Sequence, residues 1–256
     1  MDNLYRHIVE DVDKNKDKDR DDIDVRSKLR NSFTACYLIL FGTALITFIE
    51  AMRTDSAPVR HILNLETAVS LTAGFVYSMF EKIADDESKP FDLHEITYYR
   101  YVDWMITTPM LLLVLVLFLT FHTNAPLHFS YFIIILILNY IMLWCGYNAE
   151  KQKQRDIGIH RDTKIYKDKT PWSTLGFVAF AAMIAMIFYL YLGEEKDMTS
   201  SHMIMFYIFT TVWAMYGVAA EMDQLNKNMM YNVLDMIAKV FFGLGLWCYY
   251  GDVIQW

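Results

Sequence analysis

Asp235 and Lys239 are the charged residues of an apolar run near the end of the chain, Asn232-Val-Leu-Asp-Met-Ile-Ala-Lys-Val-Phe-Phe-Gly. In a helix, a spacing of four places both side chains on one face, one turn apart. A charged lysine in the middle of a membrane-spanning helix costs about 2.5–3.5 kcal/mol on insertion scales, so it needs a partner or a cavity. An amine removed from water is also a competent nucleophile toward an aldehyde. The pattern therefore leaves two interpretations open: a lysine that holds a Schiff-base chromophore, or a buried ion pair in a transporter or channel.

A second apolar run carries three polar residues on one helical face. It reads Tyr99-Arg-Tyr-Val-Asp-Trp-Met-Ile-Thr-Thr-Pro, so Arg100, Asp103 and Thr107 follow one another at spacings of three and four. An arginine and an aspartate within a membrane are costly unless each meets an opposite charge or water. Taken alone, the segment is also compatible with a structural ion pair that steadies a bundle. Together with the first run, the two cations balance the two carboxylates, which favours one shared buried site.

The elements that must position these groups are seven long apolar segments. The chain has 256 residues, of which 55% are hydrophobic and 16% aromatic, too apolar for an ordinary soluble domain. Each segment is near the ~20 residues that cross a bilayer, which excludes the shorter strands of a barrel. The sequence predicts an all-α membrane protein, a seven-transmembrane-helix bundle within residues 32–256. The predicted spans are 33–49, 62–80, 96–121, 129–148, 171–193, 203–220 and 229–251.

Charge and cysteine usage exclude several other classes. The net charge of −7 argues against nucleic acid as a partner. The three cysteines all fall within apolar runs, so neither a disulfide framework nor a metal site is expected. Residues 1–31 alternate acids and bases and are predicted to be a disordered, solvated leader. Aspartates at every second place resemble a calcium loop, but Lys16 stands at the glycine position and Asp22 at the glutamate position, so calcium binding stays open.

The distribution of basic residues gives an orientation. Loops on the N-terminal side hold most of the Lys and Arg, and the positive-inside rule would therefore place the N-terminus in the cytoplasm. Those residues are Lys151, Lys153, Arg155, Arg161, Lys164, Lys167 and Lys169, against Arg53, Arg60 and Lys196 on the other side.

Three motifs in order resemble the microbial (type 1) rhodopsins. Arg-Tyr-x-Asp-Trp-x-x-Thr-Thr-Pro resembles their third helix, and Leu-Asp-x-x-x-Lys resembles their retinal-binding helix. Trp213-Ala-Met-Tyr216 in the sixth segment is similar to the Trp-x-x-Tyr that lies against their chromophore. The resemblance covers about residues 32–251. It implies a light-activated membrane protein rather than an enzyme, surrounded by lipid, assembled as a homo-oligomer, and with its N-terminus outside, opposite to the charge rule.

The resemblance also implies roles for individual residues. All-trans retinal would form a Schiff base on Lys239, with Asp103 as counterion and proton acceptor and Asp235 as the second carboxylate. Arg100 would keep both acids ionised, and Thr107 would hydrogen-bond Asp103. The retinal pocket would be formed by Trp104, Thr108, Leu111, Met142, Gly146, Trp213, Tyr216 and Ala238.

The chain departs from the proton pumps of this family at one place. Where they carry a proton-donating acid in the third helix, this chain has Val114, so an efficient pump is less favoured. Polar residues elsewhere would line an ion path: Glu66, Ser70, Glu50 and Asn232. The segments around Glu66 and after Lys239 resemble rhodopsins of giant viruses of algae, some of which are light-gated channels. The sequence thus predicts a light-gated cation channel carrying protons or small cations; a slow proton pump and a sensory photoreceptor are the alternatives.

Overall fold

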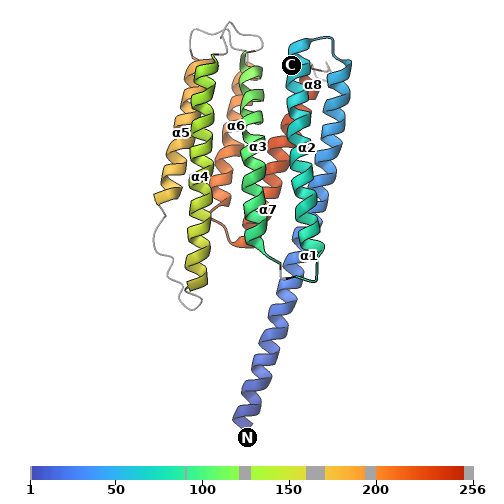
Figure 1. Cartoon of the computed structure of the whole chain (residues 1–256), viewed down its shortest axis with the longest axis vertical. Helices are drawn as coiled ribbons and strands as arrows, with labels where there is room; N and C mark the ends of the chain where they lie inside the picture. Colours follow the sequence, from blue (N-terminus) through green and yellow to red (C-terminus); the bar gives the residue numbers. More distant parts are fainter. Residues whose placement is uncertain (1, 90, 121–127, 160–170, 194–199, 251–256) are drawn as a thin grey trace.

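The computed structural model describes residues 2–89, 91–120, 128–159, 171–193 and 200–250, and their regular structure is helical (Figure 1). Long apolar runs in lipid must satisfy their own backbone hydrogen bonds, and a helix does so within one segment. The helices are α1 (Asp2–Arg53), α2 (Ala57–Asp85), α3 (Leu93–Thr120), α4 (Phe129–Ile159), α5 (Pro171–Tyr191), α6 (Ser200–Ala219), α7 (Gln224–Asp235), the π-helix η1 (Met236–Phe241) and α8 (Phe242–Tyr250).

Because α7, η1 and α8 follow one another without a break, the described ranges form a bundle of seven rods, which confirms the predicted seven-helix fold. Six of the rods are long and apolar enough to cross a membrane by length and composition. The seventh, α2, carries a buried acid in its middle and packs against α1 and α3 in the same bundle. We call the end where α3, α5 and α7 begin the leader end, and the opposite end the distal end.

The N-terminal segment differs from the sequence prediction. Residues 2–31, predicted to be disordered, are helical and belong to α1, whose first part projects beyond the bundle (Figure 1). Acids and bases at spacings of four favour an exposed helix, and Lys28 pairs with Asp24 at 2.5 Å. The side chains of residues 1–22 lie outside the described ones, so calcium binding there stays a prediction, as does the division between leader and bundle.

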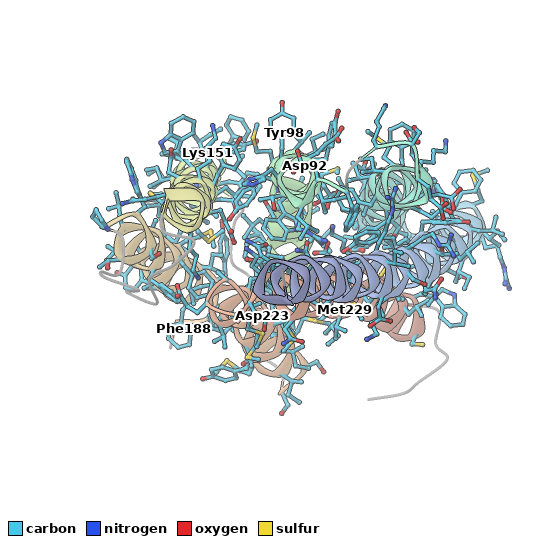
Figure 2. All side chains as sticks on the ribbon, turned by 90° about the horizontal axis from the view of Figure 1, so that it is seen from below. Asp92, Tyr98, Lys151, Phe188, Asp223 and Met229 are labelled. Atoms are coloured by element: carbon cyan, nitrogen blue, oxygen red, sulfur yellow. The ribbon has the colours of Figure 1, made fainter. Side chains whose placement is uncertain are left out.

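The last rod begins earlier than predicted and contains an irregular turn. Asp223 caps α7 by accepting the backbone N–H of Asn226, which extends the helix to Gln224. Figure 2, seen from the leader end, shows Asp223 and Met229 at this start of α7. Further along, η1 interrupts the α-helical pattern at residues 236–241, around Lys239. Such π-turns are rare and often occur at functional sites.

Apolar side chains fill the bundle on both sides of its polar centre. Toward the distal end, α3, α5 and α6 form the largest cluster, which includes Leu115, Met183 and Phe209. Toward the leader end, α1 and α2 pack around Phe33 and Phe80. The charged residues of the middle are therefore enclosed by protein from both ends.

Candidate functional site

Lys239 and Asp103 meet in the middle of the bundle. The Lys239 Nζ lies 2.5 Å from Asp103 Oδ2 and 3.6 Å from Asp235 Oδ2, and all three side chains are 1% exposed. These contacts join η1 to α3 across 136 positions of sequence. Arg100 also lies 3.6 Å from Asp235. The two cations and two carboxylates that the sequence analysis paired by charge are thus gathered in one site.

The two carboxylates are held very differently. Asp235 accepts hydrogen bonds from the Tyr77 hydroxyl at 2.8 Å, the Tyr216 hydroxyl at 2.6 Å and the Trp104 indole N–H at 3.1 Å. Among the described residues, Asp103 Oδ1 has no hydrogen-bond partner. A carboxylate that accepts several hydrogen bonds beside an arginine is stabilised as the anion. Asp235 is therefore a fixed negative charge, whereas Asp103 keeps an oxygen available to take a proton.

Thr107 makes the predicted hydrogen bond to Asp103, but to its backbone. The Thr107 hydroxyl donates to the Asp103 carbonyl oxygen at 2.9 Å, which is the local bond that a threonine makes one turn along a helix. This bond therefore does not involve the Asp103 carboxylate.

Arg100 lies on the leader side of the carboxylates. It donates to the Tyr77 hydroxyl at 2.9 Å and to Asn232 Oδ1 at 2.9 Å. Its guanidinium also stands 5.5 Å from the centre of the Tyr231 ring. These acceptors and the aromatic ring stabilise the buried guanidinium, whose Nε has no hydrogen-bond partner among the described residues. Tyr77 and Tyr231 were not predicted as site residues; the only signal was their position one or two turns from polar residues on the same helix face.

Several predicted pocket residues surround this centre. Trp104 contacts Tyr216 edge to face, with ring centroids 5.3 Å apart, and Trp213 stacks on Phe209 at 4.5 Å. The Thr108 hydroxyl donates to the Trp104 carbonyl oxygen at 2.7 Å. Leu111 is buried, and Met142 and Ala238 are partly buried.

Gly146 of α4 allows a close approach. A Cβ atom there would stand 2.9 Å from the Tyr101 hydroxyl, so only glycine fits without moving that ring.

The bacteriorhodopsin-like protein family matches residues 28–252, nearly the whole bundle. The chain belongs to this family. It is 29% identical to a green-light absorbing proteorhodopsin from a gamma-proteobacterium over 59% of this chain and 60% of the relative, and 24% identical to Opsin-1 of Neurospora crassa over 59% and 49%. The match thus spans about three fifths or less of these relatives' length. Rhodopsin homologues are mostly light-driven pumps or photoreceptors rather than enzymes.

Solved structures support the same assignment. The crystal structure of viral rhodopsin OLPVRII is 39% identical, with a TM-score of 0.74, covering 89% of this chain and 99% of that one. A blue light-absorbing proteorhodopsin from Med12 is 20% identical with a TM-score of 0.64, covering 89% of this chain and 100% of that one, a likeness of fold. This rhodopsin is therefore an integral, multi-pass membrane protein.

Members of the family bind retinal through a Schiff base to a lysine, and the residues of this rhodopsin fit that group. A Schiff-base nitrogen carries a proton and needs a nearby anion. The enclosed amine of Lys239 has one at 2.5 Å and another at 3.6 Å. The unpartnered Asp103 Oδ1 adds an acceptor beside it.

The four residues predicted to line an ion path in this rhodopsin lie at different depths of the bundle. Glu66 and Ser70 lie one turn apart in α2, both fully buried, and in the part of the chain that the structure describes neither side chain has a hydrogen-bond partner. Glu50 lies near the distal end of α1, 3.9 Å from Arg53. Asn232 lies on the leader side, bonded to Arg100. Asn232 and Glu66 thus lie on opposite sides of Lys239, and that these four residues line one ion path stays a prediction.

Proposed function

We propose that this rhodopsin transports protons across the membrane when illuminated, with retinal held on Lys239. Two lysines are fully enclosed among the described residues, and they differ in their surroundings. Lys227 pairs with Glu150 near the leader end, whereas Lys239 lies between two carboxylates in the middle. Retinal bound there would supply light-driven isomerisation. Asp103 would accept the proton from the Lys239 nitrogen, because it lies 2.5 Å away and its Oδ1 has no hydrogen-bond partner among the described residues.

The observation that carries the proposal is the placement of Glu66. In an efficient pump, a second acid on the side opposite the acceptor returns a proton to the lysine nitrogen as a general acid. Val114, at the position where pumps of this family carry that acid, is buried and apolar. Glu66 stands on the distal side instead: a Cβ atom on Gly243, one turn beyond Lys239, would lie 3.1 Å from Glu66 Oε2.

The surroundings of Glu66 suit a proton donor. An ionised carboxylate enclosed without a partner is very costly, so Glu66 is stable in the dark as the neutral acid. It therefore has a proton to give when the Lys239 nitrogen has lost one.

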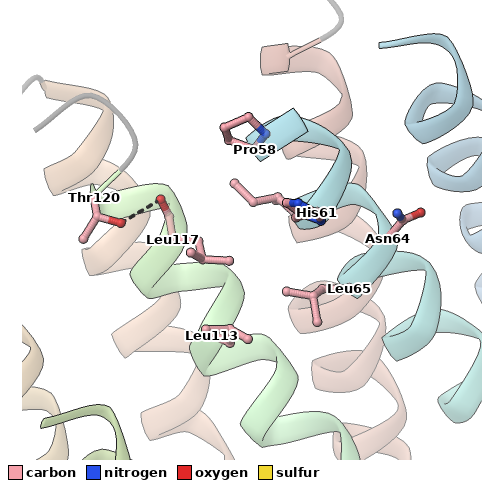
Figure 3. A pocket seen from close by; sticks show the side chains of 8 residues that line it. Pro58, His61, Asn64, Leu65, Leu113, Leu117 and Thr120 are labelled. Atoms are coloured by element: carbon pink, nitrogen blue, oxygen red, sulfur yellow. Dashed lines mark hydrogen bonds between the residues drawn. The ribbon is translucent and has the colours of Figure 1, made fainter. Parts of the chain in front are cut away.

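A groove supplies a route for recharging Glu66. It opens between α2 and α3 near the distal end, has a volume of about 760 Å³, and is lined by Pro58, His61, Ile62, Asn64, Leu65, Leu113, Leu117 and Thr120 (Figure 3). Ile62 lies one turn before Glu66 on the same face of α2. A proton entering the groove is thus one helical turn from the acid.

A light-gated cation channel is the second candidate, favoured by a strip of buried polar side chains between α1 and α2. The Thr47 and Thr67 hydroxyls are 2.8 Å apart, and Thr43, Glu66 and Ser70 are also buried in these two helices. Hydrated by a helix movement, such a strip would conduct small cations.

We further propose the orientation that the family resemblance implies, with the leader end outside. The lysines of α4 at that end, such as Lys151 (Figure 2), favour the opposite orientation. Tags on both termini, tested for protection from added protease, decide between the two orientations.

A homo-oligomer remains a prediction, which cross-linking in native-like membranes tests.

Photocurrent recording under voltage clamp, on protein reconstituted with all-trans retinal, tests the function. A pump gives current in one direction at every voltage and steadily changes the pH of an unbuffered vesicle suspension. Current that reverses with the cation gradient, without a steady pH change, would instead support the channel. The absence of both signals, with normal colour, would point to a sensor.

A further inference from the structure

A second enclosed ion pair lies outside the site described above. Glu150 of α4 and Lys227 of α7 are 3% and 2% exposed, and Lys227 Nζ donates to Glu150 Oε2 at 2.6 Å. Removing both charges from water is costly. Lys227 also lies in the first turn of α7, where the helix dipole disfavours a cation. The presence of a buried lysine at this position is therefore not explained by the stability of α7 itself.

The pair stands between Arg100 and the leader end. Asn228, the residue after Lys227, accepts a hydrogen bond from Arg100 at 3.5 Å. Tyr231, one turn further in, donates from its hydroxyl to Glu150 Oε1 at 3.5 Å while its ring lies under the Arg100 guanidinium. Arg100, Tyr231, Glu150 and Lys227 thus form a continuous row of polar contacts from the site toward the membrane surface.

The same row touches the fixed carboxylate. The Tyr231 ring packs edge to face on Trp104 at 5.1 Å and stacks on Tyr216 at 5.9 Å. Both of these partners donate hydrogen bonds to Asp235. Arg100 and the Tyr231 ring therefore lie between the Asp235 carboxylate and Glu150.

We propose that the Glu150–Lys227 pair is the gate on the leader side of the proton path, and the inference rests on the proposed transport of protons. In the dark the ion pair ties α4 to α7 and closes the row. A proton leaving the Asp103–Arg100 region bonds to a Glu150 oxygen, neutralises it, and removes the attraction for Lys227. The proton then passes to water at the leader end, Glu150 becomes a carboxylate again, and the pair re-forms; no other reactant is consumed.

A surface pair at the same end provides a matched control. Lys153 of α4 lies 3.3 Å from Glu221 Oε2, and the Glu221 side chain is 62% exposed. It joins the same end of α4 to the segment after α6, where the Glu221 carboxylate is exposed to water and Lys153 also donates to the Ala220 carbonyl oxygen at 2.7 Å. Glu221→Gln should therefore leave the gate intact.

The test uses the retinal-loaded protein in lipid vesicles and two measurements. One is the rate of bleaching by hydroxylamine in the dark, which reports access to the Lys239 nitrogen. The other is the lag between proton arrival on Asp103, followed by flash absorbance, and proton appearance at a pH-sensitive dye on the leader side. The principal variant is Glu150→Gln with Lys227→Met, which removes both charges and leaves no buried charge unpaired.

In the double variant, bleaching should be at least several-fold faster and the lag several-fold shorter, whereas Glu221→Gln should match the unmodified protein. Faster bleaching with an unchanged lag would mean that the pair only tightens the fold, and would overturn the proposal. Unchanged bleaching and an unchanged lag would overturn it too.

Should the double variant fail to bind retinal, Glu150→Gln alone is measured by the same criteria. If the unmodified protein releases no protons in light, the proposed function fails and the gate fails with it, whereas normal proton release with an unchanged lag in the double variant overturns the gate alone.

Discussion

The Lys239 nitrogen is 2.5 Å from Asp103 but 3.6 Å from Asp235, although Asp235 is its neighbour on the same helix face. The nearer carboxylate has one oxygen without a hydrogen-bond partner in the part of the chain that the structure describes. The farther one accepts three hydrogen bonds and lies beside Arg100. The lysine therefore faces an acid that can accept its proton and a second acid that stays charged.

Replacing Lys239 with alanine should abolish visible colour after reconstitution with all-trans retinal, because it removes the amine that lies between the two carboxylates. Absorbance spectroscopy of purified protein measures it. The other enclosed lysine serves as control: Lys227→Arg keeps its charge and should still yield a coloured protein. Colour in the Lys239→Ala variant would refute the assignment of this lysine.

Asp103→Asn should shift the absorbance maximum to longer wavelength, because removing the nearest negative charge destabilises the ground state relative to the excited state. Coulomb energy falls with distance, and Arg100 already offsets part of the charge of Asp235. The shift should therefore be larger for Asp103→Asn than for Asp235→Asn. Equal shifts, or the reverse order, would contradict the counterion role.

Glu66→Gln should slow recovery of the dark state by roughly 10²-fold or more, the effect typical of losing a general acid. Flash absorbance spectroscopy measures the recovery. Val114→Asp, added to that variant, should restore part of the rate by placing a donor in α3. Glu50→Gln is the control, since Glu50 lies near the distal end beside Arg53 and should not change the rate. Recovery of Glu66→Gln at the native rate would argue against the pump.

Two glycines of α8 allow the position of Glu66 to be tested without changing its chemistry. A Cβ on Gly243 would stand 3.1 Å from Glu66 Oε2, whereas a Cβ on Gly245 would meet nothing within 4 Å. Each glycine-to-alanine change should stabilise the helix by up to about 1 kcal/mol, because alanine has the higher helix propensity. Only Gly243→Ala should displace Glu66 and alter the recovery rate, measured as above. The same kinetics in both variants would mean that the contact does not position the acid.

Asp223, at the start of α7, predicts a pH-dependent stability. The backbone N–H of Asn226 donates to its carboxylate and holds the pKa of that group below its usual range. A lowered pKa stabilises the folded protein at pH values above the ordinary pKa of aspartate, about 3.9, and that contribution is lost as the pH falls through the lowered value. Asp223→Ala should therefore lower the temperature of thermal bleaching at neutral pH, and the difference from the native protein should narrow in acid. A difference independent of pH would exclude the charged cap.

The amino-acid sequence by itself determined the seven rods and the faces on which their charges lie. Apolar length fixes which segments cross a bilayer, and the helical period places Asp235 with Lys239 and Arg100 with Asp103 and Thr107. The motifs of the third, sixth and seventh segments also indicated the family and its retinal, which the comparisons confirm.

Only the tertiary structure decided which faces meet. It turned Lys239 toward Asp103, placed Asn232 beside Arg100 rather than with Glu66, and joined Glu150 to Lys227. The π-turn around Lys239 had no sequence signal that we recognised. The physical reason is that a helical period specifies which residues share a face, whereas the rotation and depth of each helix relative to its neighbours are set by the packing of all their side chains together.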